Sequence, residues 1–213
     1  MRKKLLLFLA TTFLLGNMCV FSQGQGGGIT AEFNGNLFDQ DEILITPTYL
    51  KARYFINDEI AVRLSTWAEF YSHQNVPEST LNFFSITARP GVEYHLAAEA
   101  GVFAAYVGAE FIFDYAEHSF DSTVDVPITG AWSTSDIQAF HNRGFMSFGG
   151  GLVGGADIYI GGSAYVGTEI GFAYKYTNHA EVLYGTELFL GQSKTSQFYI
   201  DLSRVIRIGF MIK

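Results

Sequence analysis

The feature that most constrains this chain is an alternation of apolar and polar residues with a period of two. It is clearest from Val102 to Tyr115, where every second residue from Phe103 onward is apolar, while Glu110 and Asp114 fall on the other side. A strand places both carboxylates on one face, whereas a helix would scatter them among aromatic rings. The segment is therefore predicted to be a β-strand with one apolar and one polar face.

The same period recurs along the rest of the chain and predicts an all-β fold of eight antiparallel strands. One face of each strand carries large aromatic and aliphatic residues, and the other carries Gly, Ser, Thr and sparse charges. In a water-soluble sandwich the charged face would be more crowded. The pattern favours a transmembrane up-and-down barrel with strands around residues 29–37, 43–55, 62–70, 84–94, 102–115, 146–158, 166–176 and 197–212.

The N-terminal segment has the pattern of an export signal. A basic start at residues 2–4 precedes an apolar run at 5–15, and Val20-Phe21-Ser22 fits a signal-peptidase site. Residues 1–22 are predicted to be a cleaved signal peptide, 23–28 a linker, and 29–213 the barrel. An uncleaved anchor would need about 20 apolar residues, and a lipoprotein at Cys19 would have a small residue where Met18 stands.

Composition excludes several classes of function. Without the first 22 residues the chain has no cysteine, so disulfides and cysteine-based metal or redox sites are excluded. It keeps 10 Lys and Arg against 21 Asp and Glu, a net charge of −11. No basic patch remains to bind nucleic acid, and no cofactor or metal site is expected. No apolar run of about 18 residues follows the signal, so membrane insertion requires a barrel.

The charges on the polar faces nearly balance, as a shared enclosed interior requires. We predict that they form an interior ion-pair network made of Lys51, Arg53, Arg63, Glu69, Arg89, Glu93, Glu110, Asp114, Glu169 and Lys175. Further charges on the same faces are Glu32, Asp157, Asp201 and Arg207. The network either plugs the barrel or lines a narrow pore. Plugging is favoured because eight strands enclose little more than side chains. The glycines at 149–151 and 154–155 are expected to leave room for these side chains.

The connections are predicted to alternate in length, as in outer-membrane barrels. Short turns are expected at 57–59, 95–101 and 161–163, and longer external loops at 73–80, 117–142 and 178–196, with a short first loop at 38–42. Two residues break the pattern. Pro90 removes a ladder hydrogen bond and predicts a bulge, whereas Arg204 falls on the lipid-facing parity and requires either a bulge or a different strand start.

The predicted loops carry two candidate sites. The acidic loop 117–142 is a candidate interaction surface through Asp121, Asp125, Trp132 and Asp136, or else simply a solvated loop. The second candidate is a lipid-modifying enzyme site built from loop residues His73, His118, His141 and His179, with Ser72, Ser119 and Asp121 nearby. No spacing forces a nucleophile to meet a base, so no catalytic residue is expected.

The export signal, the period-two strands, the turn at 57–59 and the C-terminal stretch Arg207 to Lys213 resemble the small eight-stranded outer-membrane barrels. The chain looks most like the OmpA/OmpX-type barrels known in Bacteroidota as a porin family. This resemblance implies an outer-membrane location, contact with lipid and lipopolysaccharide, and recognition by the barrel-assembly machinery. It implies no catalytic residues.

The expected function is a structural or surface-interaction role with a plugged polar interior and an unknown extracellular partner. A narrow porin-like channel is the alternative, and a lipid-modifying enzyme at the rim comes third. A soluble periplasmic barrel also stays open, and it would require the aromatic faces to point inward.

Overall fold

The computed structural model describes residues 27–35, 47–76, 78–96, 103–133, 143–160, 163–201 and 206–212. The predicted signal peptide, most of the predicted linker and the predicted first loop at 38–42 lie outside these residues. The described residues form twelve strands: β1 Ile29–Gly35, β2 Pro47–Phe55, β3 Ile60–Val76, β4 Ser79–Leu96, β5 Phe103–Ser122, β6 Ile128–Thr129, β7 Phe145–Ile160, β8 Ala164–His179, β9 Val182–Tyr184, β10 Glu187–Leu190, β11 Ser193–Asp201 and β12 Ile206–Ile212.

Nine of these strands form a closed antiparallel barrel with eight strand positions, because two of them share one position. Going round the ring, β1, β2, β3, β4, β5, β7 and β8 pair in turn, and β8 then pairs both β11 and β12. β12 pairs β1 from Ile29↔Ile212 to Gly35↔Ile206, which closes the ring. β11 and β12 together are therefore the eighth barrel strand. The predicted fold class is confirmed.

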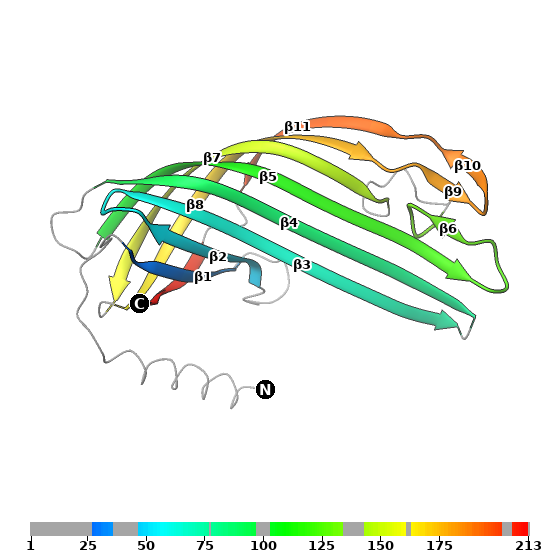
Figure 1. Ribbon diagram of the computed structural model, residues 1–213, viewed down its shortest axis with the longest axis horizontal. Helices are drawn as coiled ribbons and strands as arrows, with labels where there is room; N and C mark the ends of the chain where they lie inside the picture. Colours follow the sequence, from blue (N-terminus) through cyan, green and yellow to red (C-terminus); the bar gives the residue numbers. More distant parts are fainter. Residues whose placement is uncertain are drawn as a thin grey trace, which may run out of the picture.

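The two ends of the barrel differ. At one end, called the basal end here, β2–β3 and β7–β8 join through short turns and both terminal strands begin or finish. At the opposite, distal end, the long strands β3, β4 and β5 run well beyond β1 and β2 (Figure 1). The small strands β6, β9 and β10 extend the sheet there, where β6 pairs β5 and β9 pairs both β6 and β10.

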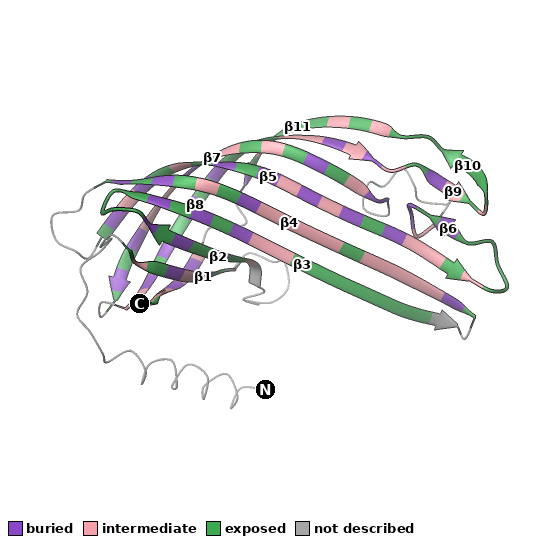
Figure 2. Ribbon diagram, viewed as in Figure 1, coloured by how far each residue is buried: buried purple, intermediate pink, exposed green. Residues whose placement is uncertain are grey.

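Inside and outside follow the predicted alternation. On β5 the buried residues include Tyr106, Glu110 and Asp114, while Val107 and Phe111 between them are exposed (Figure 2). The described outward positions of β3, β4 and β7, and those of β8 as far as Tyr176, carry no Asp, Glu, Lys or Arg. On β5 the first outward charge is Glu117, near its distal end. The assignment of apolar residues outside and charges inside is confirmed. In the part of the chain that the structure describes, no helix is both long and apolar enough to cross a membrane.

The predicted external loops are shorter than expected because the strands continue through them. β3 reaches Val76 and β4 starts at Ser79, so the predicted loop at 73–80 is a tight hairpin. β5 continues to Ser122, and β8 to β11 occupy most of 178–196. These loop boundaries were wrong because strand segments beyond the apolar band carry polar residues on both faces, as loops do. Backbone hydrogen bonds still pair these segments as strands.

The two irregular residues have different outcomes. Ala88 lies opposite Phe113 and Gly91 opposite Glu110, so the register is the same on both sides of Pro90 and the predicted bulge is wrong. Pro90 is exposed on the outer face and lies opposite Leu64. Arg204 lies outside the described residues. Asp201 pairs with Gly171 and Arg207 pairs with Gly167, so six steps along the chain correspond to four steps along β8, and the register differs by two residues between these pairs.

Inward-facing glycines make room for large interior side chains. A Cβ added at Gly155 would clash with the Tyr106 hydroxyl, and one at Gly209 would clash with the Tyr165 ring. Tyr106 and Tyr165 are almost completely buried. These glycines therefore set the volume available to the residues that fill the barrel.

Candidate functional site: an interior ion network and a distal vestibule

A fully buried ion cluster fills the basal half of the barrel. Its side chains are 0% exposed, and they are Lys51, Arg53, Arg63 and Arg207 with Glu32, Glu93, Asp157 and Glu169. Four cations thus meet four carboxylates, and the cluster is neutral. Burying unpaired charge is very costly, so this balance is the condition for placing eight charges in one enclosed space.

Ion pairs in and next to this cluster cross the barrel between opposite walls. Arg63 on β3 donates to both oxygens of Glu169 on β8, at 2.9 and 3.0 Å. Arg53 on β2 donates to Asp157 on β7 at 2.7 Å. In a ring of eight strands each of these pairs joins strands four positions apart, which are diametrically opposite. The side chains therefore span the lumen rather than line it.

Among the four carboxylates of the cluster, Glu169 contacts residues from the largest number of strands. It also accepts from Lys51 Nζ at 3.0 Å and from the Tyr106 hydroxyl, and Arg207 lies 3.6 Å away. These contacts come from β2, β3, β5 and β12, and all of them converge on one residue of β8. One side chain thus links five of the eight barrel strands.

Aromatic rings close the basal side of the cluster. The Tyr106 ring lies 4.9 Å from the Arg53 guanidinium and 5.1 Å from that of Arg207, at cation–π distances. The His95 ring stacks on the Tyr106 ring with centroids 5.2 Å apart, and the Phe55 ring is tilted against His95 with centroids 5.0 Å apart. In the sequence Tyr106 has the same parity as Glu110 and Asp114, which places it inside the barrel, but its contact with the cations was not predicted.

A second, more open layer lies on the distal side of the cluster. Arg89 on β4 donates to Asp201 on β11 at 2.7 Å, again between opposite strands, and lies 3.7 Å from Glu110. Lys175 Nζ pairs with Asp114 Oδ2 at 3.1 Å. This layer is the transition from the sealed cluster to an open space above it.

The structure brings nine of the ten predicted network residues into ion pairs: Lys51, Arg53, Arg63, Arg89, Glu93, Glu110, Asp114, Glu169 and Lys175. The exception is Glu69, which is exposed on the distal part of β3. Glu32, Asp157 and Arg207, which were recognised only as polar-face charges, lie at the centre of the cluster.

The predicted acidic loop is only partly a surface loop. Asp121 lies on β5 and accepts a hydrogen bond from Asn82 at 2.7 Å, and Asp125 lies in the exposed turn after β5. Trp132 is half-buried and donates to the Asn82 carbonyl at 3.0 Å. Asp136 lies outside the described residues. Trp132, which was predicted to belong to an interaction surface, packs against the His118 ring.

The structure describes three of the four histidines of the candidate enzyme site. His73, His118 and His179 lie on strands rather than in loops, and His141 falls outside the described residues. His118 faces the lumen while the neighbouring Ser119 lies on the outward parity, so the two cannot meet as base and nucleophile. The loop placement of these histidines was wrong because the strands extend further than the sequence indicated.

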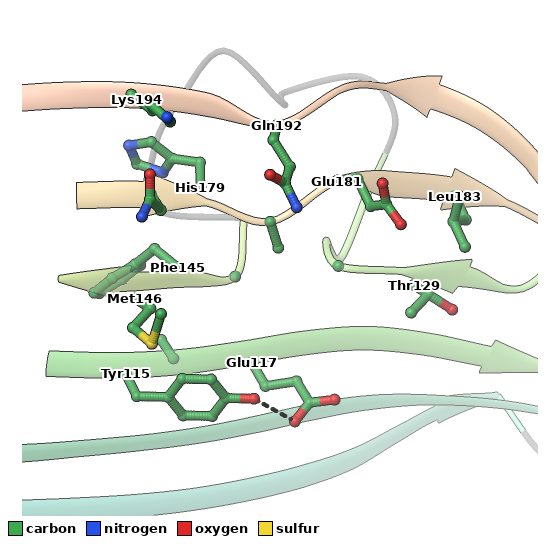
Figure 3. Close-up of a pocket in the computed structure, with 15 residues that line it drawn as sticks. Tyr115, Glu117, Thr129, Phe145, Met146, His179, Glu181, Leu183, Gln192 and Lys194 are labelled. Carbon is green, nitrogen blue, oxygen red and sulfur yellow. Dashed lines mark hydrogen bonds between the residues drawn. The ribbon is translucent and has the colours of Figure 1, made fainter.

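A pocket lies in the distal wall beside the end of β6 and the start of β7. It has a volume of about 580 Å³, and its lining includes Tyr115, Glu117, Glu181 and Gln192 (Figure 3). Tyr115 donates to Glu117 at 3.1 Å. Across the described ranges, no group of three or more His, Cys, Asp or Glu side chains is arranged to hold a metal ion.

The structure defines a class of protein: a closed eight-stranded antiparallel β-barrel with an apolar outer wall and a charged interior. No family model matches the chain, and no curated protein matches it either. Solved structures that resemble it include the following two.

The first is the N-terminal β-barrel domain of OprF from Pseudomonas aeruginosa, at 15% identity and a TM-score of 0.39, covering 89% of this chain and 100% of that one. The second is Ail, the attachment invasion locus protein of Yersinia pestis, at 12% identity and a TM-score of 0.35, covering 87% of this chain and 94% of that one. Both TM-scores are below 0.5, so the fold rests on the strand pairing above, and no function is taken from these proteins.

Proposed function

We propose that this chain is an outer-membrane barrel of the OmpA/OmpX type that conducts no solutes. Its long strands extend beyond the membrane and form an external surface. Its role is structural or surface-interacting rather than enzymatic. The observation that carries this proposal is the neutral, fully buried ion cluster whose pairs join opposite walls of the barrel.

The outer wall supports the membrane location. On β5 the outward residues are uncharged and mostly large from Phe103 to Tyr115, which at about 3.3 Å per residue and a tilt of about 40° rises about 30 Å. That height covers the apolar band of about 25 Å expected of an outer-membrane barrel. A soluble barrel would have the opposite arrangement, because an exposed apolar surface of this extent is rare in monomers. Lipid and lipopolysaccharide are the partners that this wall would contact.

The difference between the two ends supports an orientation with the basal end in the periplasm. Short turns face the periplasm in such barrels and longer segments face the medium. We expect Gln74→Cys, at the distal tip of β3, to react on intact cells with a membrane-impermeant maleimide. Asp58→Cys, in the basal turn, should react only after the cells are opened. Labelling at Asp58→Cys on intact cells would reverse the orientation.

Conductance tests the plug. The purified protein, reconstituted in a planar lipid bilayer with insertion confirmed by flotation with liposomes, should give no discrete current steps. Reproducible steps would mean that water passes the cluster, and the narrow channel would then replace the proposed role. Unchanged lipid A mass spectra on overexpression are expected as well, since His118 and Ser119 face opposite sides of β5.

A further inference from the structure

Two adjoining cavities form an open vestibule on the distal side of the ion cluster. Their volumes are about 380 and 520 Å³, and both are lined by Phe145 and Lys175. Arg89 and Asp114 also line the smaller cavity, so it ends on the second charged layer. This size is that of a small-molecule site.

Two buried polar atoms in the smaller cavity have no hydrogen-bond partner. Asp114 is 7% exposed and His118 is 3% exposed, yet Asp114 Oδ1 and His118 Nδ1 are both unsatisfied. Both residues lie on the inner face of β5, four positions apart. Buried polar atoms are nearly always hydrogen-bonded, and an unsatisfied one beside a cavity is explained by a bound water or ligand there. Two of them on one strand, lining one cavity, point to a ligand with several hydroxyls or amides.

Aromatic rings line the same cavity. The Trp132 ring lies 4.6 Å from the His118 ring and 5.7 Å from that of Phe83, both edge to face. Tyr49 and Phe145 line the cavity as well, and all four aromatic side chains are only half-buried. Half-buried rings beside polar groups offer an apolar surface for the C–H face of a ligand.

The charges around the cavity are already paired. Lys175 pairs with Asp114 through Oδ2, and Arg89 pairs with Asp201. A charged ligand would therefore have to break an existing ion pair, whereas a neutral one would not. The larger cavity adds hydroxyl groups, including Ser147 and Thr177, whose oxygens are 2.8 Å apart.

We propose that this vestibule binds a neutral hexopyranose, either as a free sugar or as the terminal residue of a glycan. Such a ring has apolar C–H faces for Trp132 and Phe83, and hydroxyls that donate to Asp114 Oδ1 and His118 Nδ1. Burial lowers the pKa of His118 to about 4, so its imidazole is neutral at pH 7 and keeps one nitrogen as an acceptor. This site goes beyond the proposed role of the barrel and does not depend on whether the barrel conducts.

Fluorescence of Trp132 tests the site in the intact barrel. Trp67→Phe removes the other tryptophan, so that the signal reports on the vestibule. The protein in detergent micelles is titrated with the methyl α-glycosides of glucose, galactose and mannose, and then with dextran, galactan and mannan. A saturable change with at least one glycoside is expected. Competition between a methyl glycoside and the corresponding polymer shows whether the site binds the free sugar and the polymer end equally well.

Two variants and one control locate the binding. Asp114→Leu and His118→Leu should each weaken binding about tenfold or more, because each removes a buried acceptor. Asp121→Asn lies on the same strand outside the cavity and should bind like the parent. Circular dichroism checks that each variant is folded. The proposal is overturned if no glycoside or polymer gives a saturable change in the folded parent, or if both cavity variants bind as Asp121→Asn does.

Discussion

Glu169→Gln should destabilise the barrel strongly, although the side chain keeps its size. The amide has no charge, and its nitrogen would place a donor against donors of Lys51 and Arg63, which lie 2.9–3.0 Å from the carboxylate. The cluster would then hold four cations and three carboxylates. Removing one partner from a buried ion pair costs about 3–5 kcal/mol.

Urea unfolding of the protein in micelles, followed by tryptophan fluorescence, measures this loss. With a slope of about 2 kcal/mol per molar urea, a loss of about 4 kcal/mol lowers the midpoint by about 2 M. Glu69→Gln is the control, because Glu69 is exposed on β3. It should change stability by less than about 0.5 kcal/mol.

A double variant separates charge imbalance from lost packing. Lys51→Met combined with Glu169→Gln leaves three cations and three carboxylates, so it should be more stable than the sum of the two single effects. If Glu169→Gln instead unfolds at the same urea concentration as Glu69→Gln, the cluster does not hold the opposite walls together, and the reasoning for a plug fails.

Three further changes test other parts of the structure. Gly209→Ala should destabilise by about 1–3 kcal/mol because its Cβ would meet the buried Tyr165 ring, whereas Gly191→Ala, with nothing within 4 Å, should be neutral in the same urea assay. Burial lowers the pKa of His118 from 6.5 to about 4, so the unfolded chain binds the proton more tightly. Stability is then complete above pH 6.5 and falls by about 1–2 kcal/mol as the pH drops from 7 to 5, and His118→Gln should flatten this slope. Arg143 donates to the carbonyls of Ala180 and Gly191 and to the Ser193 hydroxyl, so Arg143→Gln should speed hydrogen exchange from Val182 to Ser193 while leaving exchange in β5 unchanged. Faster exchange throughout the barrel would show that Arg143 is not a local link.

The sequence predicted the faces of the strands correctly because a membrane and a narrow interior make opposite demands on alternate residues. Glu110 and Phe111 are neighbours in the chain, yet one is buried in the lumen and the other is exposed on the outer wall. Period two is a local property, so a single sequence contains it. The same reasoning failed beyond the apolar band, where both faces of β3 are polar or exposed from Ser72 to Gln74 and the alternation no longer separates two solvents.

The partners of the interior charges could not be predicted, because they depend on how the strands are staggered around the ring. Arg63 and Glu169 are 106 residues apart and lie on opposite walls. Their meeting requires the register of every strand between them. The sequence could indicate which charges share the interior and that they nearly balance, but the register of each strand pair comes from the closed barrel.

The cluster also gives a physical reason for that register. A one-residue slip of β2 against its neighbours would turn Lys51 and Arg53 toward the lipid. At about 2–4 kcal/mol for each cation at the bilayer midplane, the slip would cost about 4–8 kcal/mol from these two residues, and it would leave Glu32 and Asp157 without Arg53. An apolar interior would impose no such penalty, because either face would then be accepted by lipid. The buried charges therefore specify how the eight strands align, in addition to closing the lumen between them.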